Sequence, residues 1–226
     1  MNQLTNIDLR RAVAHLPKDV MGMLKKEPLF VAGGYIRSTI LSERPNDIDV
    51  FGPDKDKLDR VALELAHSRK GRKHNTDNAF TVLSPGRTPV QFIHRWLYSD
   101  VERLMQEFDF TIARACIWWR DDKWYSCVDE RFYSDLAAKR LVYCSPDREE
   151  DAGGSLLRVR KFLRNGYFID AGNLASVIAR LCRAVDWGDV ESSDSKWVTQ
   201  VLTGLLREVD PLTVVDGVDL VDEHQI

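Results

Sequence analysis

Two glycines and two aspartates near the start of the chain have the types and spacing for chemistry on phosphates. Gly33 and Gly34 close an apolar run, and Asp47 and Asp49 follow after a short gap. Side chains two apart on a strand share a face, which puts the two carboxylates roughly 6–7 Å apart. Such oxygen ligands suit Mg²⁺, and two of these ions about 3.5–4 Å apart would hold the attacking and leaving oxygens of a phosphoryl transfer. The pattern therefore predicts nucleotide chemistry.

Strands and helices alternate in the elements expected around these residues. Helical spacing predicts helices at 7–26 (broken at Pro17), 35–41, 58–66 and 101–108. Apolar runs predict strands at 29–32, 47–51, 80–83, 90–93, 112–119 and 124–128. The polar, basic segment 69–75 is expected to be a loop. Beyond about residue 149 the pattern is helical, with helices expected at 149–168, 172–186 and 194–207.

The composition is that of an ordinary globular protein. Of the 226 residues, 44% are hydrophobic and 30% are charged, and the formal net charge is −3. A slightly acidic chain has no overall attraction to nucleic acid, so any such attraction must come from a local basic patch. The basic run 69–74 is one candidate, which could grip a phosphate backbone or simply be a surface loop.

The sequence shows no sign of membrane insertion or export. No run approaches about 18 apolar residues, and the N-terminal segment lacks the apolar core of a signal peptide. The four cysteines have no zinc-type spacing and are expected to be buried, reduced thiols. We therefore expect a cytoplasmic protein without a membrane partner.

Four landmarks, in order along the chain, resemble the signatures of one enzyme superfamily. They are Gly33-Gly34-Tyr35-Ile36-Arg37 with Asp47-Ile48-Asp49, then Asp109-Phe110-Thr111-Ile112, then Asp135-Leu136 before Lys139-Arg140, and Glu150-Asp151 before a helix that contains Arg158. On these motifs the chain resembles the polymerase-β-like nucleotidyltransferases. It is most similar to the head and neck of class II tRNA CCA-adding enzymes and bacterial poly(A) polymerases.

This resemblance implies an α+β fold, in which a small mixed sheet with helices is followed by a short helical neck. It divides the chain into an N-terminal helical segment (1–27), a nucleotidyltransferase head (28–145) and a helical neck-like domain with an acidic C-terminal tail (146–226). It also implies roles for individual residues. Asp47 and Asp49 would be catalytic and would bind two Mg²⁺ ions. The residues implied to bind the nucleotide are Gly33, Gly34, Arg37, Asp109, Asp151 and Arg158.

The chain also departs from the family's pattern. Superfamily enzymes often carry a third carboxylate on the middle strand, and its counterpart here is Gln91. Ser155 stands where the neck helix of the family has its first arginine, and Glu107 and Phe108 stand where arginines usually precede the Asp-Phe-Thr motif. These changes leave the choice of base open.

The expected function is Mg²⁺-dependent transfer of a nucleoside monophosphate from an NTP to an acceptor hydroxyl, with release of pyrophosphate. The resemblance implies an RNA acceptor, namely the 3′ end of a tRNA. Two alternatives stay open. The acceptor could be a small molecule or a protein, or the chain could be a non-catalytic module that binds nucleotide or RNA.

Overall fold

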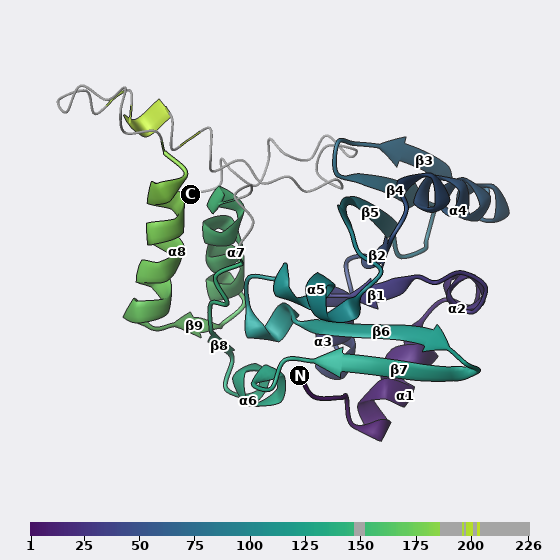
Figure 1. Cartoon of the computed structure of the whole chain (residues 1–226), viewed down its shortest axis with the longest axis horizontal. Helices are drawn as coiled ribbons and strands as arrows, with labels where there is room; N and C mark the ends of the chain where they lie inside the picture. Colours follow the sequence, from purple (N-terminus) through teal and green to yellow (C-terminus); the bar gives the residue numbers. More distant parts are fainter. Residues whose placement is uncertain (147–151, 186–195, 197, 201–202, 204–226) are drawn as a thin grey trace. The chain divides into compact units, whose positions relative to one another are not determined.

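The computed structural model describes residues 1–146, 152–185, 196, 198–200 and 203. These residues fall into two compact units (Figure 1). The first contains Met1–Met105 and Ala113–Glu130, and the second contains Gln106–Ile112 and the described residues from Arg131 onward. Each unit is considered by itself.

The first unit is built on a seven-stranded mixed sheet with the strand order β3-β4-β5-β2-β1-β6-β7. Its strands are β1 (Phe30–Ala32), β2 (Ile48–Gly52), β3 (Arg72–Asn75), β4 (Ala79–Leu83), β5 (Val90–Leu97), β6 (Ala115–Arg120) and β7 (Lys123–Val128). β2 and β5 pair in parallel, and the other neighbouring strands pair antiparallel. The β2–β5 pairing places the Asp-x-Asp segment in the middle of the sheet.

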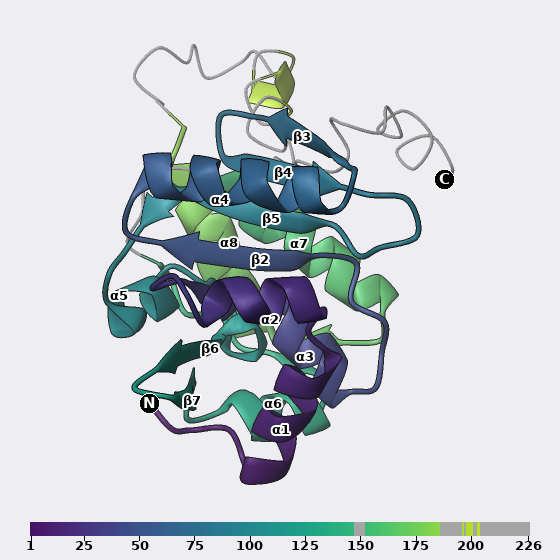
Figure 2. The same cartoon turned by 90° about the vertical axis from the view of Figure 1, so that its right-hand side faces the viewer.

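Helices cover one face of this sheet, as Figure 2 shows for α1 (Asn6–His15), α2 (Lys18–Leu24), α3 (Gly34–Ile40) and α4 (Lys55–Ser68). A fifth helix, α5 (Val101–Gln106), follows β5 in the chain. α4 begins at Asp54, whose side chain accepts a hydrogen bond from the Lys57 amide, as an N-cap residue does. Its buried side chains, Leu58 and Val61 among them, pack on β3, β4 and β5. The apolar stripe of α4 therefore fixes the helix on that face.

The second unit contains helices and a small parallel sheet. Its elements are α6 (Phe132–Ala137), β8 (Arg140–Leu141), α7 (Ala152–Arg164), β9 (Phe168–Ile169) and α8 (Ala171–Arg183), and a short 3-10 turn at Thr111–Ala113 lies at its boundary with the first unit. α8 begins at Asp170, whose side chain accepts a hydrogen bond from the Asn173 amide. α7 and α8 pack against each other.

A buried carboxylate organises the second unit. Asp135 is fully buried and accepts hydrogen bonds from the Thr111 hydroxyl at 2.7 Å and from the guanidinium groups of Arg131 and Arg140. Burial alone would raise the pKa of this carboxyl, but the bonds from Arg131, Thr111 and Arg140 outweigh it and lower the pKa. Asp135, the aspartate of the third landmark, therefore stabilises the fold of the second unit.

The predicted α+β class is confirmed, and most predicted elements are present within a few residues of their expected bounds. The expectation of a loop at 69–75 was wrong in part, because Arg72–Asn75 forms β3 and pairs with β4. Cross-strand pairing with the apolar β4 overrides the polar composition of this segment. Most of the expected helix at 194–207 lies outside the described residues. Among the described residues, no helix combines the length and apolar character needed to cross a membrane.

Candidate active site on strand β2

The turn between β1 and α3 is shaped by Gly33. Its φ is 79° and its ψ is −135°, a backbone conformation that side chains with a Cβ rarely adopt. The Gly33 amide donates to the Ala115 carbonyl at 2.9 Å, so it is used by the sheet. The Gly33 amide, which was predicted to approach a phosphate, therefore already has a hydrogen-bond partner. The geometry supports a role for Gly33 in shaping the turn.

The same turn lies beside the two aspartates. Ala32, the last residue of β1, is the cross-strand partner of Asp49 on β2. Gly33 follows Ala32 directly, so the two halves of the glycine–aspartate motif are neighbours across the β1–β2 pair. The sequence separates these halves, and the antiparallel register brings them together.

Gln91 completes this cluster from the other side of β2. It is the parallel cross-strand partner of Asp49, and its Nε2 donates to Oδ2 of Asp47 over 3.4 Å. Gln91 is 3% exposed, whereas both aspartates are partly exposed. The residue suggested as the counterpart of a third carboxylate does lie next to the aspartates, and it is neutral.

One buried hydroxyl in the same row was not anticipated. Thr81 on β4 is the cross-strand partner of Gln91 and is fully buried. Its Oγ1 makes no hydrogen bond within the described part of the chain. Only the strand register reveals this neighbour, and register is not readable from the sequence.

The donor set fits Mg²⁺ carried by a nucleotide. Mg²⁺ is usually held by one or two carboxylates together with phosphate oxygens, and Asp47 and Asp49 can supply the carboxylates. Within the described residues, no group of three or more histidine, cysteine, aspartate or glutamate side chains is placed to hold a metal ion. Asp47 and Asp49 would therefore share a metal with phosphate oxygens rather than enclose it.

Arg37 lies close to the glycine turn. A Cβ built on Gly34 would stand 3.4 Å from Nη2 of Arg37, so the guanidinium folds back towards the start of its own helix. This position agrees with a cation near the predicted phosphate site.

Two other predicted nucleotide-binding residues, Asp109 and Arg158, meet in the second unit. Nε of Arg158 donates to Oδ2 of Asp109 at 2.7 Å, and the Asp109 carboxylate side chain is 5% exposed against 30% for Arg158. The ion pair fixes both side chains. Asp151, which was also predicted to bind the nucleotide, lies outside the described residues.

Ser155, which stands in place of the expected arginine, is buried in α7. Its hydroxyl accepts a hydrogen bond from Nη1 of Arg180 at 2.9 Å. A guanidinium from α8 therefore reaches the position where the family carries its own arginine side chain. No signal in the sequence pointed to Arg180, because it lies 25 residues further along the chain.

The aromatic hairpin and the cysteines have structural surroundings. Trp118 stacks on Tyr125 at 5.8 Å between ring centroids and meets Phe30 edge-on at 6.3 Å, so these rings pack within the sheet. All four cysteines are free thiols, and Cys116 and Cys127 are buried. The prediction that all four are buried was wrong for the exposed Cys182, which lies on α8, and for the half-buried Cys144.

Comparison with solved structures defines the class of fold. The chain is similar to the Thermotoga maritima CCA-adding enzyme complexed with tRNA, with a TM-score of 0.58 and 17% identity over 98% of this chain and 55% of that one. It is also similar to a CCA-adding enzyme in complex with ATP, with a TM-score of 0.60 and 16% identity over 97% of this chain and 54% of that one. The predicted resemblance is confirmed at the level of the fold, which is similar to that of CCA-adding enzymes.

The particular family is a different one. The model described as "Gad2: Gabija anti-defense 2 family protein" matches residues 3–139, more than half of the chain, which therefore belongs to this family. The curated protein "Gabija anti-defense 2" of Bacillus phage SPbetaL7 is 25% identical over 165 residues, which cover 73% of this chain and 40% of that protein. The chain thus spans about half the length, or less, of the proteins it matches.

Proposed function

We propose that this chain is a Mg²⁺-dependent nucleotidyltransferase. The observation that carries the proposal is the convergence of Asp47, Asp49 and the Gly33 turn on β1 and β2, within a fold shared with CCA-adding enzymes. In the reaction, the oxygen of an acceptor hydroxyl bonds to the α-phosphorus of an NTP. The bond between the α-phosphorus and the oxygen that bridges to the β-phosphate breaks, pyrophosphate leaves, and the proton of the hydroxyl is released to water.

The residues of β2 and α3 would divide the work. Asp47 and Asp49 would hold up to two Mg²⁺ ions, which neutralise the triphosphate and make the acceptor hydroxyl more acidic when bound. Arg37 would supply a further positive charge beside the phosphates. Gly33 would keep the turn tight enough for the nucleotide to lie close to the backbone. Catalysis of this kind depends on positioning and charge neutralisation.

The proposed acceptor is the 3′ end of an RNA such as tRNA. The support is the fold, since one similar structure is a CCA-adding enzyme complexed with tRNA. In this proposal residues 28–145 act as the head and residues 146–226 as a neck-like domain of a cytoplasmic protein. Asp109 of the head and Asp151 and Arg158 of the neck would also bind the nucleotide.

The biological setting that we propose comes from the family. Membership of the Gabija anti-defense 2 family suggests that nucleotide transfer by this chain counters the defence after which the family is named. The matching measurement is phage plating efficiency on Gabija-carrying bacteria that express either the wild-type chain or a variant without the two aspartates. The wild-type chain is expected to raise the plating efficiency of the phage, and the variant is expected not to.

The direct test uses radiolabelled NTPs, each incubated with Mg²⁺, the protein and total cellular RNA. Label is expected in tRNA-sized RNA, with pyrophosphate released in equal amount. The double variant Asp47→Asn/Asp49→Asn should lose at least about a thousandfold in rate, because it removes both metal carboxylates.

A matched control variant makes the same change of charge at another place in the chain. Asp121 and Asp122 form the exposed turn between β6 and β7, with φ values of 48° and 57°, where asparagine is well tolerated. Asp121→Asn/Asp122→Asn should retain the wild-type rate. Full activity in the Asp47→Asn/Asp49→Asn protein would remove the proposed mechanism.

One observation favours a second candidate, a nucleotide-binding module without turnover. Gln91 offers Asp47 a neutral amide where a third carboxylate would strengthen metal binding. Calorimetry with each NTP, with and without Mg²⁺, followed by the pyrophosphate assay, separates the two candidates. Tight Mg²⁺-dependent binding with no pyrophosphate released, with RNA, small-molecule and protein acceptors all supplied, would favour the module.

A further inference from the structure

The basic run that begins at Arg69 is split between two environments. Arg69 is 7% exposed and its guanidinium binds the carboxylate of Asp19 on α2, with Nε to Oδ2 at 2.8 Å and Nη2 to Oδ1 at 3.0 Å. Lys73 is paired with Asp59 of α4 and lies over the ring of Phe80. These two cations are held within the fold, so residues 69–74 do not form one continuous basic loop.

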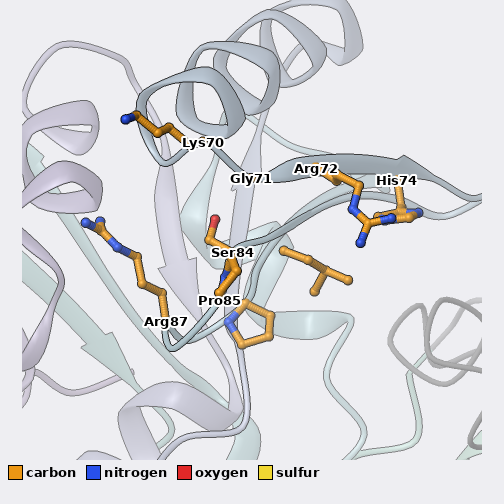
Figure 3. Close-up of a pocket in the computed structure, with 9 residues that line it drawn as sticks. Lys70, Gly71, Arg72, His74, Ser84, Pro85 and Arg87 are labelled. Atoms are coloured by element: carbon orange, nitrogen blue, oxygen red, sulfur yellow. The ribbon is translucent and has the colours of Figure 1, made fainter.

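The remaining members of the run line a pocket of about 540 Å³. Lys70, Arg72 and His74 contribute to its wall from one side, and Arg87 contributes from the loop between β4 and β5. Figure 3 shows Arg72 and His74 lying together, whereas Lys70 and Arg87 extend on the other side of Ser84. The positive charges are therefore spread along the pocket and do not converge on one point.

The basic side chains that line this pocket lack protein counter-charges to different degrees. Within the described residues, Lys70, Arg72 and His74 form no ion pair. Arg87 shares Asp19 with Arg69, with its Nη1 at 2.8 Å from Oδ2. No carboxylate is among the residues that line the pocket. In a chain with a net charge of −3, this is a local concentration of positive charge.

The strand register relates this pocket to the aspartates. His74 pairs with Thr81, Thr81 with Gln91, and Gln91 with Asp49, so these four residues form one row across four strands. Paired residues of adjacent strands point to the same face, and strands lie about 4.8 Å apart, so His74 stands about 14 Å from Asp49. Arg72, two residues before His74, shares that face. Pocket cations and metal carboxylates therefore look out on one side of the sheet.

From this arrangement we infer that the pocket binds the phosphodiester backbone of a single-stranded nucleic acid. Charges that are spread apart suit successive phosphates better than one small anion. The distance of about 14 Å to Asp49 is one that a few nucleotides of a single strand can span. The strand bound here has its 3′ end directed to Asp47 and Asp49, a part of the inference that rests on the proposed function.

The test measures binding of a 20-nucleotide fluorescent single strand, as RNA and as DNA, by anisotropy over a series of salt concentrations without NTP. The pocket variant is Lys70→Gln/Arg72→Gln. The control is Arg10→Gln/Lys123→Gln, which removes the same charge from exposed positions on α1 and β7.

A lost phosphate contact lowers the salt slope of log K by about 0.7 for a single strand, which is about fivefold in affinity at 0.1 M salt. The pocket variant should therefore bind up to about 25-fold more weakly, and the control within about twofold of wild type. Equal losses in the two variants, or no binding of either strand by the wild type at low salt, would overturn the inference. A binding loss for RNA but not for DNA would assign the pocket to RNA.

The binding measurement is independent of catalysis. The Asp47→Asn/Asp49→Asn protein should bind the strand as the wild type does while it transfers no nucleotide. A wild type that binds through the pocket but never transfers nucleotide would contradict the proposed function alone. A wild type that transfers nucleotide, with the pocket variant binding normally, would contradict this inference alone.

Discussion

The two units of the chain use their aspartates in different ways. In the second unit Asp135 is fully buried and is bound by two arginines and a threonine hydroxyl. In the first unit Asp47 and Asp49 are partly exposed, and the contact to Asp47 from Gln91 is a long one from a neutral amide. A buried, compensated carboxylate holds a fold together, whereas a partly exposed pair can still take a cation and phosphates. Four predictions test this contrast.

The largest expected effect is on stability. Asp135→Ala should lower the free energy of unfolding by roughly 3 kcal/mol, at the lower end of the cost of breaking a buried ion pair, because both arginines can partly reach water. Asp47→Asn should change it by less than about 1 kcal/mol. Urea denaturation followed by circular dichroism measures both. Similar losses in the two variants would erase the proposed distinction.

The same contrast should be visible in acid. The folded-state pKa of Asp135 is lowered, so its stabilisation is complete above the unfolded pKa of about 3.9 and is lost as pH falls through the folded value. The free energy of unfolding of the wild type should therefore decrease as the pH falls below about 5. Asp135→Asn should be less stable at pH 7 and should show a flatter decline on acidification. Parallel curves for the two proteins would argue against a stabilising role of the charge.

A third prediction concerns Gln91. Gln91→Glu would add a carboxylate beside Asp47 and Asp49, which should destabilise the metal-free protein by repulsion and tighten Mg²⁺ binding by about tenfold. The melting temperature should fall without Mg²⁺ and should recover as Mg²⁺ is added. Gln91→Met, of similar size and without charge, serves as the control. An unchanged Mg²⁺ response in Gln91→Glu would mean that the cluster does not bind the ion.

The smallest effect is expected at Thr81. Its buried hydroxyl makes no hydrogen bond within the described residues, so Thr81→Val should leave stability unchanged or raise it by up to about 1 kcal/mol. Thermal unfolding combined with the transfer assay separates two outcomes. Lower transfer at unchanged stability would show that the hydroxyl contacts the substrate, whereas a clear loss of stability would show a partner within the protein.

The sequence singled out candidate site residues more easily than their contacts. Gly33, Asp47 and Asp49 stood out because the roles proposed for them depend on backbone conformation and strand alternation, which are local. Gln91 was recognised through resemblance, and its contact with Asp47 depends on the parallel β2–β5 register. Thr81 and Arg180 were missed because strand register and helix packing bring them to their partners from distant parts of the chain.

The split of the basic run shows the same limit. Composition alone predicted a loop at 69–75, whereas alternation on β3 sends Lys73 to α4 and leaves Arg72 and His74 on the opposite face. A strand of four polar residues has no apolar pattern of its own, so only its pairing with β4 defines it.

The position of β3 at the end of the strand order has a consequence for how copies of the protein meet. An edge strand exposes backbone groups that could pair with the edge of another molecule, and charged side chains on it oppose this. If two such edges approached each other, each copy would bring its exposed Arg72, which forms no ion pair within the described residues, towards the positive charge of the other. Positive charge on this strand therefore also discourages self-association, and proteins in which it is neutralised should be more prone to form sheets between molecules.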